Sequence, residues 1–183
     1  YWYDNNKRSL PWRKELSQVK REYYTLVSEF MLQQTQVATV IPYFNNFIKD
    51  IPDIKSLSKI KEHKLLKYWE GLGYYSRVKN LKKSAKIICK EMNGKLPKKA
   101  KDLQNLPGIG RYTAGAISSI AFGLKAPVLD GNVKRVLSRL FCINKKGTTS
   151  ASENCLWEKA EDLVPIRRPG DFNQALMELG AIV

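Results

Sequence analysis

The chain has 183 residues, of which 43% are hydrophobic, and a formal net charge of +15 from 32 Lys and Arg against 17 Asp and Glu. This length and apolar content suffice for one large domain or two small lobes, and they exclude a disordered chain. The excess of positive charge favours a polyanionic partner, with nucleic acid first, an acidic membrane surface second and a merely solvated basic surface third.

The cysteines and the hydropathy pattern narrow the class further. Cys89, Cys142 and Cys155 lie far apart, their spacing matches no metal motif, and an odd number does not indicate a disulfide framework. We expect reduced, partly buried thiols in a cytosolic protein. No apolar run approaches the roughly 20 residues of a membrane span and no signal peptide is visible, so we expect no membrane partner.

Apolar residues recur at helical period along most of the chain. In chain order, helices are predicted over roughly 20–32, 37–47, 62–70, 75–92, 110–122, 131–141, 152–163 and 170–181. Pro42 is expected to kink or break the second of these. No stretch alternates long enough to predict a strand, so the predicted fold class is all-α, with short helices and tight connectors such as "DIPDIKS" and "NGKLP".

The stretch "LPGIGRYTAGAI", residues 106–117, predicts a tight turn between two helices. Pro107 ends the preceding segment, and Gly108 and Gly110 allow backbone angles that side chains would forbid. The unpaired amides at the start of the next helix carry the positive end of the helix dipole, where a phosphate fits. A helix–hairpin–helix that grips a DNA strand is therefore predicted, with a ligand-free turn as the alternative.

Several motifs resemble one known family. "LPWR" (10–13), "SEFMLQQTQV" (28–37), "GLGYYSR" (71–77), the hairpin, "PVLDGNVKRVLSR" (127–139) and "FNQALMELGA" (172–181) occur in the order and spacing of adenine DNA glycosylases of the MutY type. The resemblance covers residues 1–183 and implies a two-lobed, all-α, helix–hairpin–helix glycosylase with DNA and the extruded base in the cleft between the lobes. One lobe is expected at roughly 20–125, including the hairpin at 103–117, and the second at 1–19 plus 126–183.

Breaking a purine–deoxyribose bond requires an acid that protonates the base and an anion that stabilises the sugar cation. Glu29 lies in the apolar run "LVSEFML", where desolvation is expected to raise its pKa and keep a proton near neutral pH. Asp130 is expected to cap a helix, where amides and the dipole favour the anion. An exposed Glu29 and a purely structural Asp130 are the alternatives; the resemblance assigns them as general acid and catalytic aspartate.

The resemblance also implies supporting roles in the second half of the chain. Tyr112 stands where bifunctional relatives of the endonuclease III type carry a Schiff-base lysine, so we expect a monofunctional enzyme. Asn132 is expected to orient Asp130, or simply to lie in the first helical turn. Lys134 is expected to contact a DNA phosphate. Gln174 is a candidate reader of the adenine edge, with a surface amide as the alternative.

Further residues are expected to contact DNA or the extruded base. Trp12 and Arg13 resemble a wall of the adenine pocket, although Trp12 packed on the core is the competing explanation. The residues that resemble those flanking the lesion, where they fill the gap left by the base, are Gln33, Gln34, Thr35 and Tyr74.

The family carries four cysteines, spaced Cys-x6-Cys-x2-Cys-x5-Cys, that hold a [4Fe-4S] cluster directly after the last matching helix. This chain ends at "LGAIV", where the first of them is expected next, and its own cysteines cannot replace the set. We therefore expect a piece of a longer protein that also holds the domain recognising 8-oxoguanine; a lineage without the cluster is the alternative. By family analogy, the carbonyls of Gln104, Leu106 and Ile109 are a candidate site for a monovalent cation.

The function expected from these observations is base-excision repair. The predicted reaction is hydrolysis of the N-glycosidic bond of adenine mispaired with 8-oxoguanine or guanine, on double-stranded DNA, by a monomer located with the chromosome of a bacterium or in a eukaryotic nucleus or mitochondrion. One alternative is a bifunctional pyrimidine glycosylase/AP lyase of the endonuclease III type, against which Tyr112 and "LDGNV" speak. The other is a catalytically dead DNA-binding module, against which the retention of Glu29 and Asp130 speaks.

Overall fold

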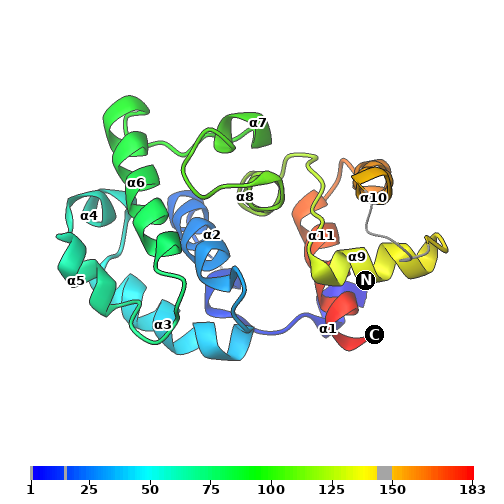
Figure 1. Cartoon of the computed structure of the whole chain (residues 1–183), viewed down its shortest axis with the longest axis horizontal. Helices are drawn as coiled ribbons and strands as arrows, with labels where there is room; N and C mark the ends of the chain where they lie inside the picture. The colour runs from blue at the N-terminus through cyan, green and yellow to red at the C-terminus, as the bar shows by residue number, and fades with distance from the viewer. Residues whose placement is uncertain (1, 15, 144–149) are drawn as a thin grey trace. The chain divides into compact units, whose positions relative to one another are not determined.

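The computed structural model of the chain describes residues 2–14, 16–143 and 150–183. Within these ranges the chain forms helices and loops without a strand, which confirms the all-α prediction (Figure 1). The elements are α1 (Trp2–Asn6), η1 (Pro11–Arg13), α2 (Gln18–Leu32), α3 (Val37–Asp50), α4 (Ile54–Lys59), α5 (Glu62–Lys67), α6 (Ser76–Glu91), α7 (Ala100–Leu103), α8 (Arg111–Phe122), α9 (Gly131–Leu140), α10 (Ser150–Leu163) and α11 (Pro169–Ile182).

The chain divides into two compact units. One is formed by Ser9–Gly110 and is called the continuous unit; the other combines Tyr1–Arg8 with Arg111–Val183 and is called the discontinuous unit. The resemblance placed residues up to about 125 in the first lobe, whereas the structure assigns α8 to the discontinuous unit. The reason is that α8 packs mainly on α11.

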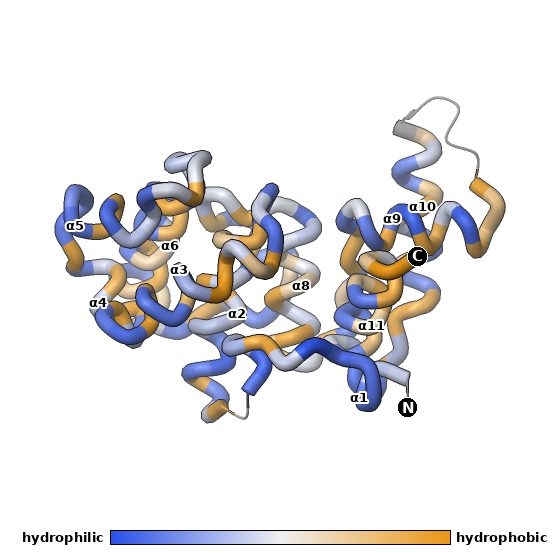
Figure 2. Tube along the Cα trace, turned by 90° about the horizontal axis from the view of Figure 1, so that it is seen from below, coloured by the Kyte–Doolittle hydropathy of each residue, from blue (hydrophilic) through white to orange (hydrophobic). Residues whose placement is uncertain are grey.

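The continuous unit is organised around α2, which packs against η1, α3 and α6. The apolar residues of α2 recur at threes and fours, so they share one face and are fully buried at Leu26, Val27, Phe30 and Met31. Helix α4 packs against α6 (Figure 1). Along the tube in Figure 2, hydrophobic and hydrophilic residues alternate within single helices, as amphipathic helices require.

Pro42 does not break the second predicted helix, because α3 runs without interruption from Val37 to Asp50. A proline in a helix removes one backbone hydrogen bond. The buried face formed by Val40, Phe44 and Phe47 continues on both sides of the proline, and this packing holds the helix together. Of the two expected effects of Pro42, the break is therefore wrong, and the kink stays a prediction.

The discontinuous unit is organised around α11, which packs against α1, α8 and α9, while α10 packs on α9. Its core is a cluster of buried apolar side chains contributed by α8, α9, α10 and the segment before α9: Ala116, Val128, Leu129, Val133, Leu137, Leu156, Trp157 and Ala160. None of the helices in the described ranges is long and apolar enough to cross a membrane.

Candidate active site

The turn between α7 and α8 requires glycine at one of its two glycine positions. Gly108 has a φ of +79°, and a Cβ built on it would lie 2.8 Å from both Asn80 Cβ and Phe30 Cε1. Gly110 does not have a positive φ, so the expectation of a special backbone angle is wrong at this residue. No described atom lies within 4 Å of the position of its Cβ, so the backbone of Gly110 is open to a ligand.

Side chains of the continuous unit fasten this turn. The hydroxyl of Ser84 on α6 donates to the Pro107 carbonyl at 2.9 Å, and the Gln33 side-chain amide donates to the Gly108 carbonyl at 3.3 Å. The turn and the segment after α2 are thereby held in one arrangement. Both were predicted to contact DNA, and the structure brings them together.

The candidate cation site lies on the same turn. Of the carbonyls of Gln104, Leu106 and Ile109, that of Leu106 accepts a hydrogen bond from the Ile109 amide at 3.2 Å. A cation would share this oxygen with the amide. The site stays a prediction.

Glu29 lies near the end of α2 with 6% of its surface exposed. Its helix neighbours Val27 and Phe30 are fully buried, and one of its own carboxyl oxygens, Oε2, is buried as well. The apolar setting expected from the sequence is therefore present. Burial of this kind is what a carboxylic acid needs if it is to carry a proton near neutral pH; the catalytic role of Glu29 stays a prediction.

Asp130 is the N-cap residue of α9. Its Oδ1 accepts the Val133 amide at 2.8 Å, and its Oδ2 accepts from the Asn132 side chain at 3.4 Å. Burial raises the pKa of Asp130 above its ordinary value, while the hydrogen bonds from Val133 and Asn132 act in the opposite direction. The cap and its partner Asn132 are as expected. The direction of the pKa shift is not, because the effect of desolvation, which raises the pKa, is larger than the effect of the hydrogen bonds, which lower it.

The first turn of α9 packs directly on α11. A Cβ built on Gly180 would lie 2.5 Å from the Asn132 carbonyl oxygen. Arg135 donates to Asn132 Oδ1 at 3.2 Å and also to the Gly180 carbonyl. Gly180 and Arg135 thus hold Asn132 in place. Neither residue was predicted from the sequence, although a glycine inside the predicted helix 170–181 signals a close approach of another backbone.

Tyr112 is the second residue of α8 and is half-buried. Its ring packs against the core cluster that contains Leu129 and Val133, the apolar residues on either side of Asp130. Its hydroxyl donates to Met177 Sδ of α11 at 3.4 Å. Tyr112 therefore connects α8 to α11 at the edge of this core cluster.

Two other predicted residues of the discontinuous unit already have protein partners. Lys134 Nζ lies 2.8 Å from Glu153 Oε1, with both side chains well exposed, so contact with a phosphate requires an exchange of partner. Gln174 is 7% exposed, and its amide donates to the Gly170 carbonyl of its own helix at 3.3 Å. Reading a base edge would require this amide to turn away from α11.

The remaining predicted residues belong to the continuous unit. Gln33 and Thr35 are half-buried and Gln34 is exposed, directly after α2; Tyr74, before α6, is 61% exposed. Two of these residues have a left-handed backbone, with φ of +59° at Gln34 and +47° at Tyr74. Such conformations are uncommon outside glycine and cluster at functional sites.

Trp12 and Arg13 lie in η1. The Trp12 ring is 9% exposed and meets Phe44 edge-on, with 5.1 Å between ring centroids and an interplanar angle of 69°. Trp12 therefore packs on the core, as the competing explanation predicted. Arg13 is half-buried. Their part in an adenine pocket stays a prediction.

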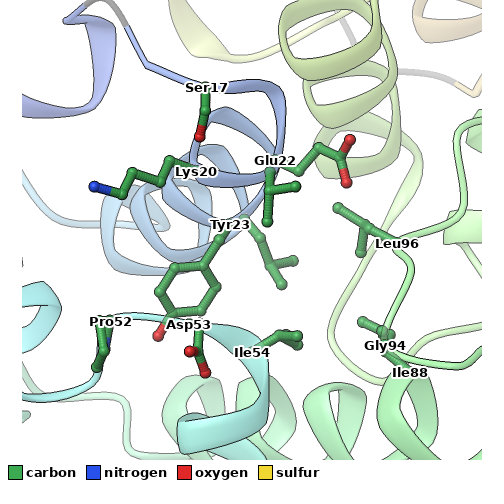
Figure 3. A pocket seen from close by; sticks show the side chains of 12 residues that line it. Ser17, Lys20, Glu22, Tyr23, Pro52, Asp53, Ile54, Ile88, Gly94 and Leu96 are labelled. Atoms are coloured by element: carbon green, nitrogen blue, oxygen red, sulfur yellow. The ribbon is translucent and has the colours of Figure 1, made fainter.

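A separate hollow of about 340 Å³ lies in the continuous unit (Figure 3). Its walls come from the start of α2, the start of α4 and the end of α6, and are mostly apolar, with Tyr23, Ile54, Ile88 and Leu96 among the residues that form them. The Tyr23 hydroxyl is already bonded to the Ile51 carbonyl at 2.8 Å. None of the predicted site residues lines this hollow.

The described residues do not fit the implied iron–sulfur cluster. No group of three or more His, Cys, Asp or Glu side chains in the described part of the chain could hold a metal ion. Cys89 is in the continuous unit and its thiol donates to the Ile54 carbonyl at 3.7 Å, whereas Cys142 and Cys155 are in the discontinuous unit.

Comparison with known proteins agrees with this fold. Over the whole length of this chain, an adenine DNA glycosylase of Rattus norvegicus is 49% identical, and one of Buchnera aphidicola from Schizaphis graminum is 46% identical. The chain spans only 36% and 52%, respectively, of the length of these two relatives.

Solved structures show the same architecture. A thermostable thymine-DNA glycosylase superimposes with a TM-score of 0.87 and 30% identity, over 100% of this chain and 82% of that one. A trapped endonuclease III–DNA covalent intermediate superimposes with a TM-score of 0.77 and 19% identity, over 96% and 78%, which shows the shared fold. Residues 27–162 match the HhH-GPD superfamily base excision DNA repair protein family. The chain therefore belongs to the HhH-GPD superfamily of base-excision DNA repair proteins.

Proposed function

We propose that this chain is the catalytic region of an adenine DNA glycosylase. The reaction is hydrolysis of the N-glycosidic bond of adenine mispaired with 8-oxoguanine or guanine in double-stranded DNA. Support for the substrate comes from the relatives named adenine DNA glycosylase, whose similarity extends over the entire chain. The observation that carries the chemistry is the pair of differently placed carboxyl groups: Glu29 buried in α2, and Asp130 capping α9.

In the proposed reaction, Glu29 donates its proton to a ring nitrogen of adenine. The bond between C1′ of the sugar and the base breaks, and the bonding electrons leave with the neutral adenine. Asp130, as the anion, stabilises the positive charge left on the sugar. Water then attacks C1′ and gives a proton to the carboxylate of Glu29, so the products are free adenine and an abasic site and the acid is restored.

The supporting residues follow from the contacts described above. Asn132 holds Oδ2 of Asp130. Tyr112 occupies the position where a lyase would need a lysine, so the enzyme is monofunctional and leaves the DNA strand uncut. The enzyme acts as a monomer, and its +15 charge and the open backbone at Gly110 serve phosphate binding. The [4Fe-4S] cluster belongs to the full-length protein in this proposal and takes no part in the step.

The test is single-turnover excision by the full-length protein on duplexes carrying adenine opposite 8-oxoguanine or opposite guanine. Glu29→Gln and Asp130→Asn should each lower the excision rate by about 10²–10⁴-fold without a comparable loss of DNA binding. The matched controls are Glu22→Gln, a second glutamate of α2, and Asp53→Asn, the N-cap aspartate of α4. Both controls should leave the excision rate unchanged.

A thymine opposite guanine is the informative competing substrate, because the thymine-DNA glycosylase shares the whole fold at 30% identity. The proposal is wrong if thymine is released from this mismatch faster than adenine is released. Borohydride treatment during the reaction tests monofunctionality. Efficient trapping of enzyme on oxidised-pyrimidine DNA would instead support a glycosylase/lyase.

A further inference from the structure

Arg77, the second residue of α6, has only 5% of its surface exposed and lies against the end of α2. Its Nη1 donates to the Met31 carbonyl at 2.8 Å and the Phe30 carbonyl at 3.3 Å, and it also bonds the Gln33 carbonyl and, at 3.1 Å, Thr35 Oγ1. The last carbonyls of a helix have no partner within the helix. At the end of α2, Arg77 supplies that partner.

The same guanidinium also holds the segment that leads into α6. Its Nη2 donates to the Leu72 carbonyl at 2.9 Å and the Gly73 carbonyl at 3.2 Å. The guanidinium also lies over the rings of Trp69 and Tyr74, at 5.4 and 5.5 Å from their centroids. One side chain thus joins two loops about 40 residues apart in the sequence.

The bonded carbonyls include those directly before the two left-handed residues. The Gln33 carbonyl belongs to the peptide group that precedes Gln34, and the Gly73 carbonyl to the one that precedes Tyr74. A non-glycine residue in this conformation carries a strain of about 1–2 kcal/mol and persists where its surroundings fix it. Arg77 fixes both peptide groups at once.

The location of Arg77 is otherwise unfavourable for a cation. It lies in the first turn of α6, where the helix dipole repels positive charge, and burial lowers the pKa of its guanidinium. The negative end of α2 and the carbonyls offset this cost. A lysine has no planar fork of donors and could not reach both loops.

We propose that Arg77 is a positioning residue that fixes Gln34 and Tyr74 together in left-handed conformations, as a preformed pair of exposed side chains for contact with DNA. The DNA-contacting part rests on the proposed function. The coupling of the two loops through Arg77 does not depend on it.

The first experiment is a mutational cycle read by thermal unfolding of the full-length protein. Arg77→Lys should lower Tm by about 5 °C or more, because several buried carbonyls lose a partner. In a background with Gln34→Gly and Tyr74→Gly, where glycine adopts a positive φ without strain, Arg77→Lys should lower Tm by about half as much or less.

The proposal would be overturned if Arg77→Lys lowered Tm equally in the unsubstituted protein and in the double-glycine background. It would also be overturned if the Arg77→Lys protein failed to fold in both backgrounds. Folding only in the glycine background would support it. Lys82→Met is the matched control, because Lys82 is the other buried cation of α6. The effect of this substitution should not depend on the glycine background.

The second experiment measures single-turnover adenine excision by Arg77→Lys. We expect roughly a tenfold or greater loss on adenine opposite 8-oxoguanine, where the loops must help to separate the base pair, with DNA binding retained. On adenine opposite an abasic site, which is already unpaired, the loss should be about threefold or less. Equal losses on the two substrates would show a merely structural role. If the unsubstituted protein releases no adenine, the proposed function fails, while the unfolding cycle still decides the coupling.

Discussion

The two glycines of the turn between α7 and α8 should differ in how much stability the protein loses on replacement by alanine. In Gly108→Ala, the new methyl group would lie 2.8 Å from both Asn80 Cβ and Phe30 Cε1, on a backbone with φ of +79°. The left-handed conformation costs about 1–2 kcal/mol and the crowding a further 1–3 kcal/mol. Because Asn80 Cβ is fixed to its helix, we expect about 3 kcal/mol in total.

For a chain of this size, 1 kcal/mol corresponds to about 2–4 °C in Tm, so Gly108→Ala should melt about 6–12 °C lower. Gly110→Ala should leave Tm within a few degrees, because its φ is not positive and no described atom lies near the added methyl group. Differential scanning calorimetry of the two variants and the unsubstituted protein measures both values.

The same pair tests whether the turn binds phosphate. A methyl group at Gly110 fills the space through which a phosphate would approach, so Gly110→Ala should weaken binding to undamaged duplex DNA by roughly tenfold while the protein remains folded. Two results would refute this reasoning: a Tm for Gly108→Ala equal to that of the unsubstituted protein, or unchanged DNA affinity for Gly110→Ala.

Three further predictions concern the discontinuous unit. Since burial raises the pKa of Asp130, excision measured against pH should fall on the acid side at a higher pH than an exposed aspartate would give. A raised pKa also means that the stability of the fold declines as pH increases through this pKa. Asp130→Asn keeps a capping side chain without the charge, so the variant should be inactive and yet have a Tm at pH 7 at least as high as that of the unsubstituted protein. A lower Tm would contradict the role of burial. Lys134→Met breaks an exposed ion pair with Glu153, so Tm should change by no more than about 2 °C. The slope of log DNA affinity against log salt concentration should decrease in magnitude by about 1, because one phosphate contact is lost. An unchanged slope would exclude that contact. Gly180→Ala places a methyl group 2.5 Å from the Asn132 carbonyl oxygen. Calorimetry should show that the free energy of unfolding falls by about 1–2 kcal/mol, and adenine excision should slow by at least tenfold. A stabilised variant would show instead that α11 can move.

Helices with a long periodic pattern could be predicted closely from the sequence. The segments 20–32, 75–92 and 110–122 correspond to α2, α6 and α8, which begin and end within two residues of the predicted limits. Helices α1 and α4 were missed because five or six residues are too few to show a period, whereas α7 is the helix that was predicted to precede the hairpin. For α4, the capping pair of Asp53 and Ser56 was the available signal.

The site was predictable where it depends on neighbours in the sequence. The cap of α9 by Asp130 is a local interaction with Val133, and residue types three apart suffice to indicate it. The net direction of the Asp130 pKa, the approach of Gly180 to Asn132 and the contacts of Arg77 all depend on which distant segments pack together. No local pattern carries that information.

The division into units implies an order of events during synthesis. Ser9–Gly110 is a continuous stretch, so it can fold as soon as it has left the ribosome. Asp4 and Arg8 must wait for their partners, because Arg8 binds Glu178 and Asp4 binds Arg168, which come 170 and 164 residues later in the sequence. At ordinary rates of about 5–20 residues per second, that interval lasts on the order of ten seconds, during which the segment that carries Asp4 and Arg8 lacks its packing partners.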